Sequence, residues 1–150
     1  MGKARLAIAA AVVVLAALAA GGAVAVSGDI TGFPNKIATV DLTGYKLQTF
    51  YPLGTNTGNT FDQTYAGGGR VSAFGVKGPG TGLVFKSKYI AMPVGHKLLM
   101  VTWYLNPKGT ITDVFLMNFK SGIVSDVAPN KKPQSLGTVK VLKTGSHPIP

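Results

Sequence analysis

Apolar and polar residues alternate in short stretches along residues 26–150, and this alternation predicts β-strands separated by turns. The stretches are rich in Thr, Val, Tyr and Phe, and none repeats apolar residues at helical spacing over three turns. Gly and Pro recur between the stretches and end them. The pattern favours an all-β domain, a small antiparallel sandwich or barrel of about eight short strands. The predicted strands are Lys36–Asp41, Tyr45–Tyr51, Gly69–Val76, Leu83–Met92, Leu98–Leu105, Thr110–Phe119, Gly122–Val127 and Thr138–Lys143.

The clearest local prediction is a hairpin that turns at residues 106–109, where Asn-Pro-Lys-Gly suits a type I turn followed by a left-handed glycine. Pairing Leu105 with Thr110 predicts that Trp103 faces Thr112. Farther along, the same register pairs Val101 with Val114 and Leu99 with Leu116. The opposite face would then carry Leu98, Met100, Thr102, Tyr104, Ile111, Asp113, Phe115 and Met117. Both faces are largely apolar, which predicts cover on both sides, from the rest of the domain, a partner protein or an apolar ligand.

The N-terminal segment differs from the rest of the chain. Lys3 and Arg5 precede an Ala-rich apolar run, and Ala23-Val24-Ala25 has the small-x-small form of a signal-peptidase site. We therefore expect residues 1–25 to be a helical signal peptide and residues 26–150 to be exported, to the periplasm or the cell exterior. The alternative is an uncleaved anchor through residues 6–26, which would leave residues 26–150 outside on a single-pass membrane protein. The last residues of the chain are expected to fray.

The charge balance is strongly basic, with 15 Lys and Arg against 5 acidic residues. The lysines are scattered, and Lys86 and Lys88 lie on the same face of their predicted strand. A nucleic-acid groove would combine Arg with exposed aromatic residues, so nucleic acid is not an expected partner. Diffuse positive charge instead favours anionic polymers or anionic lipid surfaces, or simply keeps the protein soluble.

Catalytic and metal-binding motifs are absent from the sequence. The chain has no Cys, and neither of its two His residues has a second ligand at metal-binding spacing, so no metal or cofactor is predicted. The glycines of residues 78–82 precede a predicted strand, whereas a phosphate loop needs a helix there. A hydrolase or lyase site could assemble only in space, and the test is whether two or more candidate residues meet in one cleft. Those candidates are His96, Asp113, Ser121, Ser125 and Asp126.

These observations favour a non-catalytic function. We expect an exported β-domain that binds a partner protein or an anionic envelope surface, with the hairpin of residues 98–119 supplying contact area. A membrane-anchored accessory subunit of an envelope complex and a small secreted hydrolase are the alternatives, and the oligomeric state is left open. The candidate binding residues are Tyr104, Phe115, Met117, Lys86 and Lys88.

Overall fold

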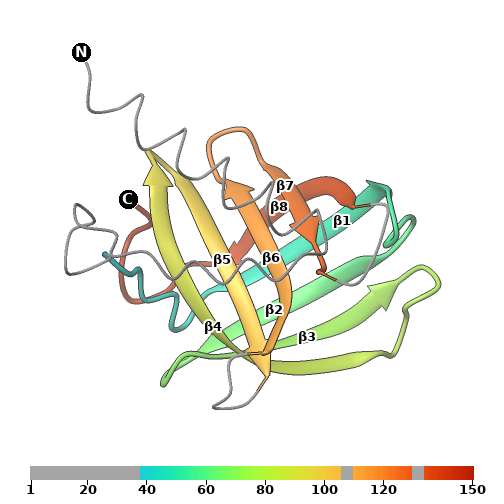
Figure 1. The fold of residues 1–150 in the computed structure, drawn as a ribbon, viewed down its shortest axis with the longest axis horizontal. Coiled ribbons are helices and arrows are strands. Elements are labelled where there is room, and N and C mark those ends of the chain that lie inside the picture. Colours follow the sequence, from blue (N-terminus) through green and yellow to red (C-terminus); the bar gives the residue numbers. More distant parts are fainter. Residues whose placement is uncertain (1–37, 106–109, 130–133) are drawn as a thin grey trace, which may run out of the picture. The chain divides into compact units, whose positions relative to one another are not determined.

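A computed structural model describes residues 38–105, 110–129 and 134–150. These residues form eight antiparallel strands that follow one another around a closed barrel (Figure 1). The strands are β1 Lys46–Leu53, β2 Thr60–Ala66, β3 Arg70–Lys77, β4 Val84–Gly95, β5 Leu98–Leu105, β6 Thr110–Asn118, β7 Ile123–Val127 and β8 Ser135–Lys143.

Each strand pairs with its neighbours in sequence, and β1 pairs with β8 to close the sheet. The all-β prediction is confirmed, and of the two architectures it allowed the chain forms the barrel. A closed sheet leaves no strand edge open to another chain. The predicted leader and the hairpin turn at 106–109 lie outside the described residues. No helix long and apolar enough to cross a bilayer occurs in the described ranges.

The strand predictions need two corrections. Residues 38–41 are not a strand, although the Val40 N–H donates a hydrogen bond to the Ala91 carbonyl oxygen. Strand β2 was not predicted at all. Its inward residues are Phe61, Gln63 and Tyr65, and the amide in the middle breaks the apolar alternation. The remaining strands match their predictions to within a few residues at each end.

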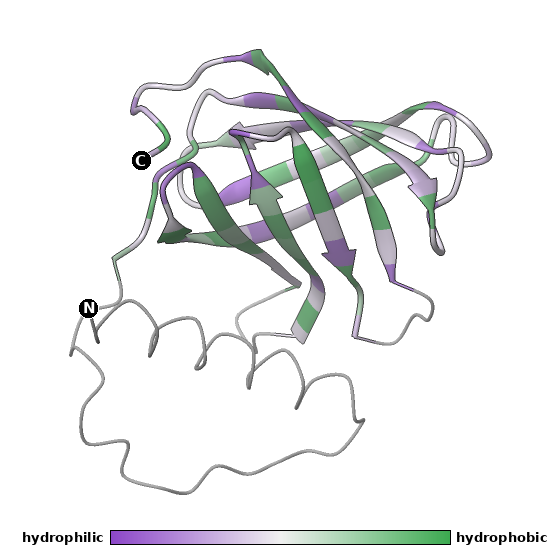
Figure 2. Cartoon of the chain, turned by 90° about the horizontal axis from the view of Figure 1, so that it is seen from above, coloured by the Kyte–Doolittle hydropathy of each residue, from purple (hydrophilic) through white to green (hydrophobic). Residues whose placement is uncertain are grey.

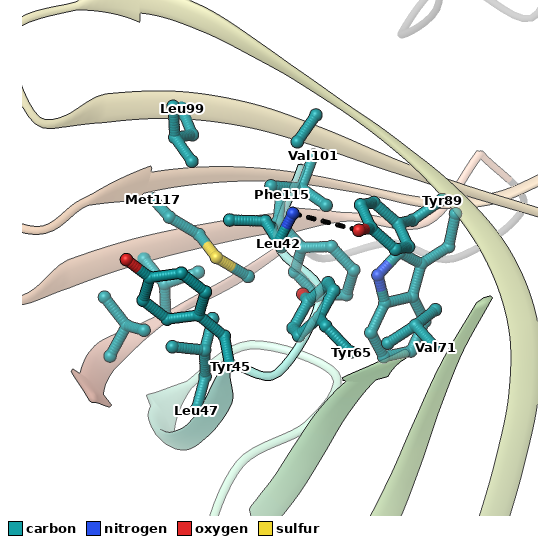
Figure 3. Close-up of a cluster of buried hydrophobic side chains, with 14 of the residues drawn as sticks. Leu42, Tyr45, Leu47, Tyr65, Val71, Tyr89, Leu99, Val101, Phe115 and Met117 are labelled. Atoms are coloured by element: carbon teal, nitrogen blue, oxygen red, sulfur yellow. Dashed lines mark hydrogen bonds between the residues drawn. The ribbon is translucent and has the colours of Figure 1, made fainter. Parts of the chain in front are cut away.

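Side chains alternate between the barrel interior and its outer surface, and Figure 2 shows the resulting bands of apolar and polar colour along the strands. The interior is densely packed at the end where β1 begins. Figure 3 shows this cluster, to which strands from all round the barrel contribute. Its labelled members are Leu42, Tyr45, Leu47, Tyr65, Val71, Tyr89, Leu99, Val101, Phe115 and Met117.

The segment before β1 and the C-terminal residues cover this end of the barrel. Leu42 is fully buried, and its N–H donates to the Tyr89 hydroxyl at 3.0 Å (Figure 3). The Tyr45 hydroxyl donates to the His147 carbonyl oxygen at 2.7 Å, and Ile149 packs against the core. We call this the closed end. The opposite end, where the β1–β2 and β3–β4 loops lie, is called the open end below.

A β-bulge changes the predicted register of the β5–β6 hairpin. Leu105 pairs with Thr110 as predicted, but Trp103 lies opposite Asp113 instead of Thr112. Thr112 is the extra residue, and its hydroxyl donates to the Trp103 carbonyl oxygen at 3.3 Å. A one-residue slip exchanges the two faces of a strand. Because of it, the β6 residues that point into the barrel are Asp113, Phe115 and Met117.

Candidate functional site

A cavity lies inside the barrel toward its open end. Its volume is about 70 Å³, counted as the space open to the centres of water-sized molecules. Since one water needs roughly 10–15 Å³ by that measure, the cavity holds several waters or a small organic group. It is lined by Tyr51, Asn56, Phe61, Gln63, Ala73, Phe85, Trp103, Asp113, Phe115 and Asp126.

Two aspartates face this cavity from adjacent strands. Asp126 on β7 lies opposite Phe115, and Asp113 lies two residues before Phe115 on the same face of β6. Positions related in this way are diagonal neighbours about 7–8 Å apart. Four of the chain's five acidic residues lie in the described ranges, and two of those four line this one cavity.

Asn56 reaches the cavity from the β1–β2 loop. Its side-chain N–H donates to Asp126 Oδ2 at 2.9 Å, and its backbone N–H donates to the Ser135 hydroxyl at 3.0 Å. Gly54 starts this loop with φ of 95°, and a Cβ there would lie 2.0 Å from the Gln134 carbonyl oxygen. Glycine is therefore required where the loop passes this close to the backbone at Gln134.

Aromatic rings form most of the apolar lining. Trp103 packs against Phe115 with ring centroids 4.8 Å apart, and Phe61 meets Phe85 edge-on at 5.8 Å. Tyr51 meets Phe61 at 6.4 Å. Rings held in this way offer flat apolar surfaces and polarised edges to a bound molecule.

A buried polar network lies beneath the cavity. The Tyr65 hydroxyl donates to Gln63 Oε1 at 2.8 Å, and the Gln63 amide lies 3.4 Å from the Thr49 hydroxyl. The Trp103 indole N–H is buried without a hydrogen bond of normal geometry. Its interaction with the Tyr65 hydroxyl lowers the pKa of Tyr65, against the larger effect of burial. The floor of the cavity thus carries hydrogen-bonding groups in an otherwise apolar interior.

Burial controls the ionisation of the tyrosines around this network. Desolvation raises the pKa of Tyr51 well above its ordinary value, and the nearby charges of Asp126 and Asp113 raise it further. Burial likewise raises the pKa of Tyr65. Both hydroxyls are therefore protonated at neutral pH and can donate hydrogen bonds.

The five predicted binding residues do not form one surface. Phe115 and Met117 are buried inside the barrel, so neither can contact a protein partner from its position, and Phe115 instead lines the cavity. Tyr104, Lys86 and Lys88 lie on the outer surface, where Lys88 pairs with Tyr104 on one side and with Arg70 on the other. Strand β4 is hydrogen-bonded on both sides, so its lysines do not protect a free edge.

Of the residues considered for catalysis, only Asp113 and Asp126 meet in one cleft. His96 lies in the β4–β5 turn at the closed end, Ser121 lies in the exposed β6–β7 turn, and Ser125 points outward from β7. Within the described ranges, no three His, Cys, Asp or Glu residues are grouped so that they could hold a metal ion.

Sequence reasoning did not select the other polar residues of the cavity. Asn56 lies in a polar loop, and nothing local to the sequence indicates that this loop folds back onto Asp126. Gln63 lies in the strand that was not predicted. An amide between Phe61 and Tyr65 at strand spacing is the one available signal, because a polar residue in an inward series often marks a site.

No family model matches the chain, and no curated protein matches it either. Among solved structures, the chain is similar to a crystal structure from Burkholderia vietnamiensis described as a putative beta-lactamase. The TM-score is 0.55 and the identity 16%, over 70% of this chain and 99% of that chain. At this identity the likeness shows the barrel fold alone.

Proposed function

We propose that the protein binds a small organic molecule inside its barrel, at the cavity between the aromatic rings and the two aspartates. The observation that carries this proposal is that Asp113 and Asp126 face the same cavity as Trp103 and Phe115. Binding sites of this kind combine apolar walls with a few converging polar groups, and they are common in the mouths of β-barrels.

The proposal also accounts for polar residues that cost stability. A barrel interior filled with apolar side chains would be more stable than one holding carboxylates and a buried amide. Gln63 is only 2% exposed and Asp126 only 4%. Retaining them is explained if they contribute hydrogen bonds and charge to a ligand.

Catalysis by the same cavity is the second candidate. Two carboxylates can act as general acid and general base when their surroundings separate their pKa values. The described residues that line the cavity include no Ser, Cys, His or Lys, so an acid–base reaction fits this part of the lining better than attack by a side-chain nucleophile.

Trp103 provides a direct test, because it is the only tryptophan of the chain and it lines the cavity. We expect its fluorescence to change saturably with a single-ring probe, using benzyl alcohol, benzylamine and benzoate in turn. Because two carboxylates face the cavity, benzoate should bind most weakly. Ala73→Leu should abolish the response, since its added side chain would occupy the cavity.

The matched control is Ser72→Leu, which adds the same side chain to the outer face of the same strand. It should respond to the probes like the unmodified protein. The proposal fails if none of the three probes changes the Trp103 fluorescence saturably, or if Ala73→Leu responds with undiminished affinity. If binding is observed, catalysis is favoured when the unmodified protein converts the bound ligand to a product and the Asp113→Asn variant does not.

We also propose, from the N-terminal sequence alone, that the barrel acts outside the cytoplasm. The basic residues, apolar run and small-x-small site of residues 1–25 support this location. An intact mass measured separately on soluble and membrane fractions distinguishes a cleaved exported protein, starting at Val26, from an anchored one.

A further inference from the structure

The tip of the β3–β4 hairpin exposes a cluster of large apolar side chains at the open end of the barrel. Phe74 and Val84 lie opposite each other on the outer face, 48% and 59% exposed. Leu83, in the adjoining turn, is 52% exposed, and Val76 on β3 is 37% exposed. We call these four residues the apolar tip. An apolar cluster at the end of a hairpin is costly in water and indicates an interaction surface.

Cationic residues lie directly behind the apolar tip on the same outer face. Lys86 follows Val84 by two residues and Lys88 by four, so they lie about 7 Å and 13 Å farther from the tip at the usual rise of a strand. Lys88 is opposite Arg70, and both are exposed. Like charges directly opposite each other destabilise a sheet, which argues for a function that retains them.

No acidic residue offsets these charges along the hairpin. The sequence has no Asp or Glu between Asp62 and Asp113, a stretch that includes all of β3 and β4. On the neighbouring strand β2, Asp62 lies opposite Phe74 and accepts a hydrogen bond from the Gln48 amide at 2.8 Å. The outer face of the hairpin therefore has an apolar end and a positively charged stem.

We propose that this hairpin docks the open end of the barrel onto an anionic lipid bilayer. Apolar side chains of peripheral proteins enter the boundary between headgroups and acyl chains to a depth of about 5–10 Å. Cations one or two rows behind them then lie at the level of the lipid phosphates, which long lysine side chains can reach. Tyr104, paired with Lys88, adds an aromatic ring with a polar hydroxyl next to this charged row.

This docking would bring the cavity to the membrane surface. Phe85 belongs to the same hairpin, is 42% exposed, and lines the cavity. A molecule dissolved in the outer part of the bilayer could then enter the barrel without crossing bulk water. The docking inference does not depend on the cavity proposal, because it rests on the outer face of the hairpin alone.

The chain has no cysteine, so a single environment-sensitive label can be placed at will. We would attach the label to the full-length variant Leu83→Cys and, as a control, to Ile123→Cys, which is similarly exposed on β7. Vesicles of phosphatidylcholine with phosphatidylglycerol should shift the emission of the label at position 83 to the blue. The label at position 123 should show no shift, and neither should either label with pure phosphatidylcholine vesicles.

Charge variants then test the electrostatic part. A juxtamembrane cation contributes a factor of about five in binding to an anionic surface, so Lys86→Gln with Lys88→Gln should weaken vesicle binding roughly tenfold or more. Lys140→Gln, an exposed lysine on β8, should change it by less than twofold. The inference is overturned if position 83 shows no shift, if both labels shift alike, or if the double variant binds as tightly as the Lys140 control.

Discussion

Asn56 ties the open-end loop to one carboxylate of the cavity, that of Asp126. Its amide donates to Asp126 Oδ2 at 2.9 Å. Because Asp126 is buried, losing the donor removes a hydrogen bond that bulk water cannot readily replace. Position 56 therefore couples the stability of the barrel to the shape of the cavity.

We predict that Asn56→Ala lowers the free energy of unfolding by about 1–3 kcal/mol, the usual range for removing one partner of a buried hydrogen bond. Urea unfolding followed by Trp103 fluorescence measures this loss. Thr57→Ala in the same loop removes only an exposed side-chain bond to the Gly54 carbonyl and should cost less. Equal losses from the two variants would contradict the role assigned to Asn56.

At the scale of elements, one bulged residue decides which side chains line the cavity. The turn sequence predicts the first pair of the β5–β6 hairpin correctly, and a regular ladder from there would have pointed Thr112 and Val114 inward. The bulge allows Phe115 and Met117 to pack inside the barrel, and no local sequence pattern predicts it. Because β6 carries apolar residues on both faces, its sequence does not indicate which face points into the barrel.

Deleting Thr112 should make the β5–β6 ladder regular without exchanging its faces. Ile111 would still oppose Tyr104, and Asp113 would still oppose Trp103. We expect a folded barrel whose Trp103 fluorescence still responds to the probes described above. Deleting Leu116 is the comparison, because it would make Phe115 and Met117 consecutive, turn one of these two buried side chains outward and unfold the barrel. If the Thr112 deletion destabilises the barrel as much as the Leu116 deletion does, the bulge itself is required for folding.

At the scale of the whole molecule, the all-β class and seven of the eight strands follow from sequence, whereas barrel closure does not. Strand β2 escaped prediction because Gln63 lies where the pattern requires an apolar residue. Residues 38–41 were predicted as strand because Thr39 and Val40 favour strands, but the structure packs Val40 against the core from a segment outside the sheet. Closure depends on pairing β1 with β8, about 90 residues apart, and only the complete set of inward faces specifies it. The cavity depends on that closure, so its two carboxylates could be proposed as candidates but not placed together.

The enclosed tyrosines give the whole barrel a characteristic response to alkaline pH. Burial raises the pKa of Tyr51 and of Tyr65 above the ordinary value of about 10, which the unfolded chain retains. The stabilisation from keeping these hydroxyls protonated is fully present below pH 10. Above it, the unfolded state loses protons that the folded state keeps, so stability falls as pH rises.

We predict a melting temperature that declines from about pH 10 upward, and a shallower decline in Tyr51→Phe, measured by thermal denaturation between pH 8 and 11.5. Tyr104→Phe removes an outer-surface hydroxyl and should decline like the unmodified protein. If Tyr51→Phe declines just as steeply, the alkaline transition belongs to other groups, and the interior around the cavity is better hydrated than its burial indicates.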